Sequence, residues 1–169
     1  MKKQAALFAF PMLDRSRAGG FSLIELIVTL VIAGILATMT APLFSSFIAS
    51  QRVKTASFDM VAALTQVRSE AIKRNADVSM TAAGGDWKNG WAITTVIAAV
   101  TKTLGSQSAY ANLTIAEASS TLAVTFNGDG RSAALRFTVS DSQAGSNVTP
   151  RCVSVSLNGQ ASSKVGSCS

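Results

Sequence analysis

Residues 20–41 read GFSLIELIVTLVIAGILATMTA, and Glu25 is the only charged residue among them. A helix of about 20 apolar residues is long enough to cross the roughly 30 Å hydrocarbon core of a bilayer. The run that begins at Phe21 is also too long for the apolar core of a cleaved secretory signal. The sequence therefore predicts a membrane-spanning helix over residues 21–44, with a simple signal anchor as the alternative on topology alone.

The charges around this run predict its orientation. Four basic residues precede it, namely Lys2, Lys3, Arg15 and Arg17. Because Lys and Arg are retained on the cytoplasmic side of a membrane, we expect a cytoplasmic N-terminus and a head outside the cytoplasm. The chain of 169 residues has a formal net charge of +6, and about half of this charge lies in the first 20 residues. The head therefore has only a mild positive bias.

Glu25 is costly in this setting. An ionised carboxylate inside a membrane helix costs about 2.5–3.5 kcal/mol on insertion scales, so it should have a partner. Cleavage between Gly20 and Phe21 would create an α-amino group one helical turn from Glu25. A neighbouring subunit that brought its own such amine to the carboxylate would neutralise both charges, which makes Glu25 a candidate for subunit assembly.

The residues GFSLIEL at positions 20–26 follow a basic leader and open the apolar run. In this they resemble the leader and N-terminal helix of type IV pilins and of type II secretion pseudopilins. The resemblance implies that a prepilin peptidase cleaves after Gly20, that Phe21 is then N-methylated, and that residues 1–20 are the prepilin leader. This leader is long for the family, and a start at Met12 would give a more typical one.

The same resemblance implies a location and a set of partners. The protein would be a single-pass protein of the inner membrane, with a periplasmic globular head over residues 45–169. The subunit would later leave the membrane lipid and enter a pilus or pseudopilus filament through Glu25. Its partners would be the prepilin peptidase and other major and minor pilins or pseudopilins.

The head is predicted to contain a long amphipathic helix followed by strands. Apolar or small residues recur with helical spacing from Val53 to Ala71, so one face of this helix should pack on a sheet. The helix is expected to end near residue 76, and residues 102–120 are expected to form a loop with one short strand near 113–116. The other strands are expected at 78–81, 90–96, 121–126, 135–139 and 152–157. One helix before consecutive strands predicts an α+β fold with an antiparallel sheet.

Three further motifs resemble, in order, the landmarks of the GspH/FimT family of minor pilins and minor pseudopilins. They are Trp87-x-x-Gly90-Trp91, Phe126-Asn127-Gly128-Asp129-Gly130-Arg131 and Val153-Ser154-Val155-Ser156-Leu157-Asn158-Gly159. The resemblance implies a low-copy subunit near the filament tip. The tryptophans themselves are expected to anchor the core, because large aromatic side chains bury the most apolar surface.

Cys152 and Cys168 are the only cysteines, and both lie in the part predicted to be outside the cytoplasm, where oxidation is favoured. We expect a disulfide between them, and closing this loop should stabilise the fold by about 3 kcal/mol. Type IV pilins commonly carry such a C-terminal disulfide, whereas the secretion pseudopilin of this family usually does not. The resemblance therefore favours the pilus.

The composition argues against an enzyme. The chain has no histidine, which excludes a Ser-His-Asp triad, a histidine-activated cysteine and a histidine-ligated zinc. The acidic residues of the head form no grouped pair and no metal-ligand spacing, and no phosphate-binding loop is present. No catalytic residue, metal or cofactor is expected.

DNA binding is a more serious alternative. Some minor pilins of this family take up DNA through a C-terminal Gly-Arg-x-Arg motif, but residues 159–162 here read Gly-Gln-Ala-Ser. The remaining candidates are Arg131, Arg136, Arg151 and Lys164, which would bind phosphates non-specifically if they clustered on one face. Mild surface charge for solubility is the favoured explanation of these residues.

These patterns predict a minor type IV pilin that joins or primes a pilus and supports twitching motility. The first alternative is a minor pseudopilin of type II secretion. The second is a DNA-binding minor pilin that serves natural transformation.

Overall fold

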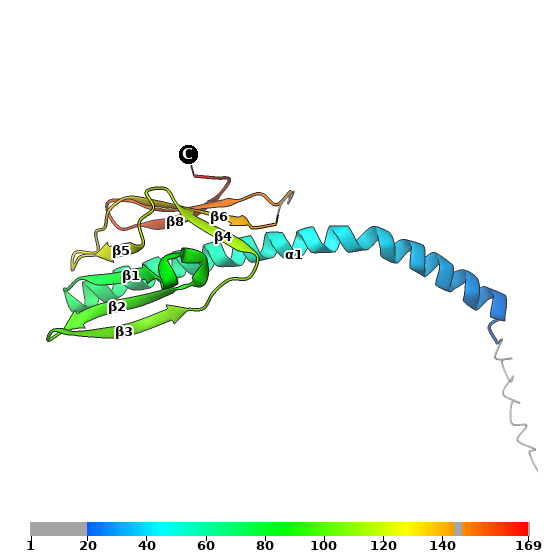
Figure 1. Ribbon diagram of the computed structural model, residues 1–169, viewed down its shortest axis with the longest axis horizontal. Helices are drawn as coiled ribbons and strands as arrows, with labels where there is room; N and C mark the ends of the chain where they lie inside the picture. Colours follow the sequence, from blue (N-terminus) through cyan, green and yellow to red (C-terminus); the bar gives the residue numbers. More distant parts are fainter. Residues whose placement is uncertain (1–19, 144–146, 169) are drawn as a thin grey trace, which may run out of the picture. The chain divides into compact units, whose positions relative to one another are not determined.

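The computed structural model describes residues 20–143 and 147–168, with the side chains of residues 39–43 outside the description. The chain divides into two compact units, residues 1–40 and residues 41–169. The second unit is the head, and it combines a helix with two antiparallel sheets (Figure 1). The α+β fold predicted from the sequence is confirmed.

The head is built on one face of the helix α1 (Leu23–Arg74). The helix face that was predicted to pack on a sheet is buried, and we call it the stripe. Its residues are each at most 1% exposed: Val53, Ser57, Met60, Leu64, Val67 and Ala71. Beyond Arg74 the amide of Asn75 donates to the carbonyl of Ile72, and the amide of Ala76 donates to that of Ala71. These two bonds form a Schellman motif, and Asn75 adopts the left-handed φ of 48° that the motif needs. The helix therefore ends at Arg74, slightly before the predicted end.

All neighbouring strands in both sheets are antiparallel. The first sheet has the order β3-β2-β1-β5 and contains β1 (Val78–Ala82), β2 (Trp91–Ile97), β3 (Val100–Gln107) and β5 (Ala123–Phe126). The second sheet has the order β4-β6-β7-β8 and contains β4 (Leu113–Glu117), β6 (Leu135–Asp141), β7 (Arg151–Val155) and β8 (Ala161–Val165). Two short 3-10 turns, η1 (Ala83–Gly85) and η2 (Trp87–Asn89), connect β1 to β2.

Two strands correct the sequence prediction. The strand β3 overlaps the segment 102–120 that was expected to be a loop, and β8 lies beyond the last predicted strand. Both are edge strands, and most of their residues are exposed. A strand exposed on both faces needs no alternation of apolar and polar residues, so its sequence carries little strand signal. The short strand predicted near 113–116 is present as β4.

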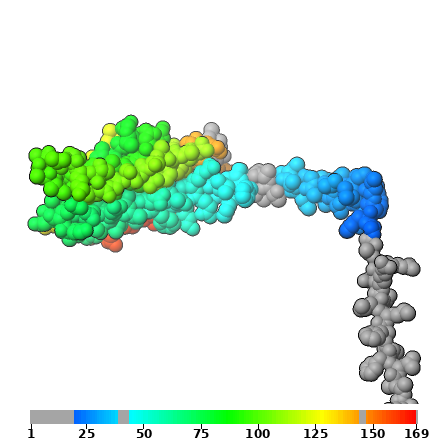
Figure 2. Space-filling model, turned by 90° about the horizontal axis from the view of Figure 1, so that it is seen from below, coloured from blue at the N-terminus to red at the C-terminus, as the bar shows by residue number. Residues whose placement is uncertain are grey.

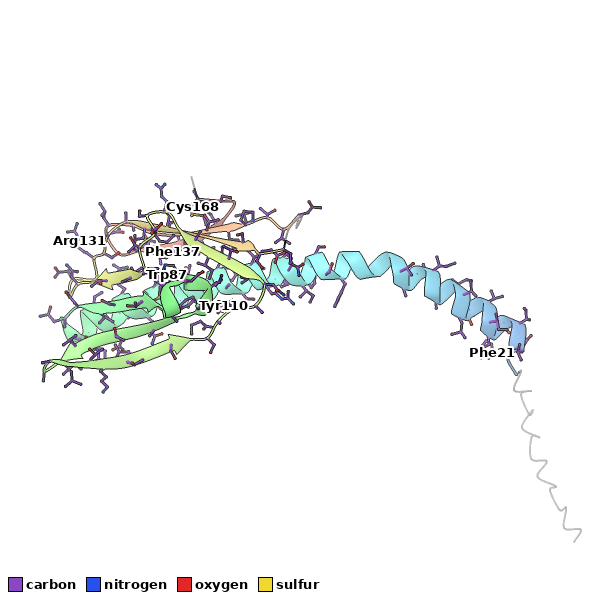
Figure 3. All side chains as sticks on the ribbon, in the orientation of Figure 1. Phe21, Trp87, Tyr110, Arg131, Phe137 and Cys168 are labelled. Carbon is purple, nitrogen blue, oxygen red and sulfur yellow. A yellow bond between two sulfur atoms is a disulfide. The ribbon has the colours of Figure 1, made fainter. Side chains whose placement is uncertain are left out.

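Both tryptophans are core residues, as predicted, with exposures of 2% for Trp87 and 3% for Trp91. The indole Nε1 of Trp87 donates to the carbonyl of Thr121 over 2.9 Å. Its ring meets Phe137 edge to face, with the ring centroids 5.1 Å apart (Figure 3). Trp87 lies just before the first sheet's β2, and Phe137 lies in β6 of the second sheet. The aromatic contact therefore joins the two sheets.

Three glycines bring the end of α1 and two turns into close contact. A Cβ atom on Gly159 would lie 1.9 Å from the carbonyl oxygen of Gly130. A Cβ on Gly130 would lie 2.6 Å from Cδ1 of Ile72, and one on Gly128 would lie 2.8 Å from the carbonyl carbon of Asn75. We call Gly128, Gly130 and Gly159 the glycine stack. Two sequence motifs that are about thirty residues apart are thus one packing contact in space.

Tyr110 ties the connection between β3 and β4 to α1. Its hydroxyl donates to Oδ2 of Asp59 over 3.0 Å, and its ring lies 5.9 Å from that of Trp91. Asp59, which the helix pattern places on the solvated side, is therefore partly covered. Burial, and after it the hydrogen bond from Tyr110 to Asp59, raises the pKa of the phenol above its usual 10.0.

Replacement of Gly159 by alanine tests the glycine stack. Gly159 and Gly85 have nearly the same left-handed φ, 75° and 77°, but nothing lies within 4 Å of a Cβ on Gly85. We expect Gly85→Ala to lower the free energy of unfolding by about 1 kcal/mol, through backbone strain alone. Gly159→Ala should lower it by about 3 kcal/mol, because strain and overpacking add. Urea unfolding measures both, and equal losses would contradict the contact.

The substitution Tyr110→Phe tests the raised phenol pKa. Because the folded-state pKa lies above the unfolded value, the stability that this group contributes is complete below about pH 10 and is lost as the pH rises further. Tyr110→Phe should therefore cost about 1 kcal/mol at pH 7, from the lost hydrogen bond, and less at pH 11. Tyr110 is the only tyrosine, so phenolate absorbance in the native protein reports its pKa directly. A parallel pH dependence of parent and variant would refute this account.

Candidate assembly site

The predicted cleavage site lies in open backbone before α1. Gly20 and Phe21 precede the helix, and neither belongs to a regular element. Phe21 is 80% exposed, and nothing lies within 4 Å of a Cβ placed on Gly20. The peptide bond between these two residues is therefore accessible, and Figure 3 shows Phe21 at the start of α1.

Glu25 lies in the first turn of α1. Ser22 precedes it by three residues, which is the sequence pattern of a capping box, and an acidic side chain in the first turn is favoured by the helix dipole. The side chain of Glu25 is exposed. Within residues 20–143 and 147–168 it forms no ion pair. Its carboxylate is therefore available to another molecule.

The first part of α1 is apolar on every side and exposed on every side. Each residue from Phe21 to Thr38 is exposed within the chain. A helix of this kind needs a cover of lipid or of neighbouring helices. Among the described residues, no helix is long and apolar enough to span a membrane. The span predicted at 21–44 includes residues 39–43, whose side chains lie outside the described part of the chain.

Three of the four DNA candidates, Arg131, Arg151 and Lys164, do not lie on one face. The guanidinium of Arg151 lies 5.2 Å from the ring centroid of Phe58 on α1, and its Nε donates to Oγ of Ser163. Lys164 is exposed and pairs with Cys152, the residue after Arg151. Because successive side chains of a strand alternate between faces, Arg151 and Lys164 lie on opposite faces of the second sheet.

Arg131 lies apart from both sheet faces. It belongs to the turn after β5, and its backbone amide donates to Oδ1 of Asn127 over 2.9 Å. Its side chain is exposed. Figure 3 places Arg131 at the end of the head, away from Cys168 on the second sheet. Arg131, Arg151 and Lys164 therefore do not form the predicted basic cluster, whereas Arg136 and Lys164 line the same hollow on the second sheet.

The predicted disulfide between Cys152 and Cys168 is present. Cys152 is buried in β7, and the amide of Cys168 donates to Oγ1 of Thr138 in the adjacent β6. The amide of Gly166 also donates to the carbonyl of Pro150. These contacts fasten the C-terminal tail across the solvent side of the second sheet.

Sequence reasoning missed two features of the head. The glycines of the glycine stack were seen as turn residues and family landmarks, but their mutual contact requires knowledge of the fold. Of the apolar run Val96–Val100, only Val96 fell within a predicted strand, and the run itself was not singled out, although it contains five consecutive apolar residues. In the described part of the chain, no group of three or more Cys, Asp or Glu side chains is placed to hold a metal ion.

Comparison with known families identifies the family to which the chain belongs. The model of the family described as Type II transport protein GspH matches residues 56–159, which is most of the head. The chain belongs to the GspH family. A second model, the prokaryotic N-terminal methylation motif, matches residues 15–41 of this GspH-family chain, and this range contains Gly20, Phe21 and Glu25. The chain is thus a pilin-like or pseudopilin-like subunit with a methylation-type N-terminus.

Solved structures of two proteins share the fold of this GspH-family chain. The type IV minor pilin FimU of Pseudomonas aeruginosa matches in one crystal form with a TM-score of 0.60 and 22% identity, over 70% of this chain and 92% of FimU. A second crystal form matches with a TM-score of 0.57 and 24% identity, over 66% and 91%. The minor pseudopilin EpsH of the type 2 secretion system of Vibrio cholerae matches with a TM-score of 0.57 and 10% identity, over 68% and 97%. No curated protein sequence gives a significant match.

Removal of the Glu25 charge tests its role in assembly. We expect Glu25→Ala and Glu25→Gln to be cleaved and methylated normally, because the exposed bond between Gly20 and Phe21 is unchanged. Incorporation into sheared filaments should fall at least tenfold in both, because neither offers a charge to a neighbour's α-amino group. Intact mass under non-reducing conditions gives the processing state, and immunoblots of filament and membrane fractions give incorporation. Normal incorporation of the glutamine variant would refute a charge-based role.

Proposed function

We propose that this GspH-family chain is a minor type IV pilin. It is inserted in the inner membrane with a cytoplasmic N-terminus and a periplasmic head, cleaved between Gly20 and Phe21 by the prepilin peptidase, and N-methylated at Phe21. It then leaves the membrane and joins a type IV pilus, or the complex that primes one, together with other major and minor pilins. Its role is structural, in support of pilus assembly and twitching motility.

The N-terminal segment supports the processing and assembly steps. The cleavage bond is exposed, Glu25 has no ion-pair partner among the described residues, and the helix that follows is apolar on all sides. An apolar helix exposed on all sides is unfavourable in water, and an unpaired carboxylate is unfavourable inside a membrane. Each is relieved when the new α-amino group and the apolar helix meet the corresponding parts of neighbouring subunits.

The Cys152–Cys168 disulfide is the single observation that favours the pilus over the secretion machine. A C-terminal disulfide is typical of the type IV pilins that this chain resembles and is usually missing from the related secretion pseudopilin. A filament that extends beyond the cell is also exposed to an oxidising medium in which a disulfide persists.

A minor pseudopilin of type II secretion is the second candidate. It is favoured by the description of the matching family and by the fold shared with EpsH. DNA binding has less support, because Arg151 and Lys164 lie on opposite faces of the second sheet and Arg131 lies in a separate turn.

Deletion of the gene separates these candidates. We expect loss of surface pili and of twitching, with exoproteins secreted normally and transformability reduced no more than piliation. Electron microscopy, twitching zones and exoprotein assays of culture medium and periplasm measure these outcomes. Complementation with the parent chain should restore pili, and complementation with Glu25→Ala should not. Accumulation of exoproteins in the periplasm of a normally piliated mutant would instead identify a pseudopilin.

A further inference from the structure

The hairpin formed by β2 and β3 extends beyond the core of the head. All residues from Val96 to Thr103 are exposed, and we call these eight residues the arm. Val96 and Val100 are 63% and 67% exposed, and Ile97 is 45% exposed. The residues before the arm are covered, and Thr95 is 3% exposed. Figure 1 shows the arm at the end of the head near the end of α1, and Figure 2 shows this region at the surface.

The tip of the arm is strained as well as apolar. Ile97 pairs with Val100, so Ala98 and Ala99 form a two-residue turn. Their φ angles are 49° and 62°, both in the left-handed region. Such turns usually contain Asn and Gly, because a side chain raises the cost of a positive φ. Exposed apolar side chains and a positive φ at residues other than glycine are both unfavourable. Their occurrence at one place is typical of a functional contact.

No described residue covers the arm, because every residue from Val96 to Thr103 is exposed. A two-stranded ribbon without a covering layer is only marginally stable in water. Contact with another molecule would bury the apolar side chains and stabilise the ribbon.

The side chains of the arm favour a protein over a lipid surface. The arm contains no aromatic residue, and Lys102 is its only charged one. Loops and helices that enter a membrane interface use Trp, Tyr or Phe with several basic residues. Aliphatic β-branched side chains such as Val96, Ile97 and Val100 instead suit a dry groove between protein elements.

The head itself shows what kind of groove a related subunit offers. A groove of about 620 Å³ lies beside α1, and its lining combines apolar residues such as Phe47, Val53 and Val165 with polar residues and the basic Lys54 and Arg151. On α1 the groove extends as far as Lys54, whereas the arm lies by the end of the helix, because Thr95 donates to the carbonyl of Asp77. These positions are about 30 Å apart along a helix.

We propose that the arm docks into such a groove on a neighbouring pilin-family subunit, where that subunit's helix enters its head. The proposal rests on the proposed function as a filament subunit and adds a head-to-head contact to the helix contacts of Glu25. An apolar projection at one end of a head and a partly apolar groove toward the other make a heterologous contact. Contacts of this kind repeat as a closed ring or as an open helix, and the open form is suited to stacking subunits along a filament.

Site-specific photo-crosslinking of the full chain in its own bacterium tests the proposal. A photoreactive residue replaces Lys102 in the arm or, as the control, Lys88, which is also an exposed lysine and lies outside both the arm and the groove. We expect position 102 to give at least tenfold more crosslink to a pilin-family subunit than position 88. Mass spectrometry should map the crosslink to the partner's helix or to the strands beside it, where the helix enters the head.

Two double variants then test the apolar tip. With the photoreactive residue at position 102, Ile97→Ser with Val100→Ser should reduce the crosslink at least tenfold. The control pair, Leu122→Ser with Leu157→Ser, removes two other exposed apolar side chains and should leave the crosslink unchanged. Because all four side chains are exposed, thermal unfolding should be nearly the same in both variants.

The possible outcomes test the arm proposal separately from the proposed function. The chain could be present in filaments and yet crosslink from position 102 only to lipid, to an unrelated protein or to nothing. This result would overturn the arm proposal and leave the proposed pilin function intact. A crosslink that survives Ile97→Ser with Val100→Ser would also overturn it. Absence of the parent chain from every filament would overturn the proposed function, and the arm proposal with it.

Discussion

The burial of one face of α1 between Val53 and Ala71 is the contact on which the rest of the head depends. Met60 and Leu64 are fully buried there, together with residues from both sheets, such as Met80 and Phe137. Full burial of each such side chain contributes about 1.5–3 kcal/mol. Each sheet has only one apolar face, so neither would be stable without the helix and the other sheet beside it. The aromatic contact, the glycine stack and the disulfide then fix how the layers and turns meet.

The features that the sequence predicted well are those governed by local periodicity. The stripe on α1 could be found because helical spacing repeats over many residues, and β1 and β6 could be found because buried and exposed residues alternate. The edge strands β3 and β8 could not, since exposure on both faces removes the alternation. The glycine stack also could not, because its contacts join residues far apart in the chain. At the N-terminus, the cleavage site and the role of Glu25 stay predictions, and they rest on an isolated charge in an apolar run, which is conspicuous without any tertiary information.

The positions of the predicted basic residues show how strand register determines which side chains lie on the same face of a sheet. Arg151 faces α1 and stacks on Phe58, whereas Lys164 faces solvent beside Cys152. The turn at Asn158-Gly159 sets the register between β7 and β8, and it was visible in the sequence. Counting back from that turn would have placed the two basic residues on opposite faces. Net charge alone predicts attraction to phosphates, but the pleat determines whether the charges act together.

The exposed edges of the two sheets explain how the head remains selective in its contacts. Open edge strands pair readily with other chains, and charged side chains on them discourage this. The edge strands β3 and β8 each carry one lysine, Lys102 and Lys164, and both are exposed. The apolar tip of the arm has no such charge between Val96 and Val100. The two lysines thus oppose backbone pairing along the edges, whereas the side chains of the tip remain able to contact another molecule. The proposed role as a filament subunit requires both properties, since attraction without exclusion would lead to aggregation.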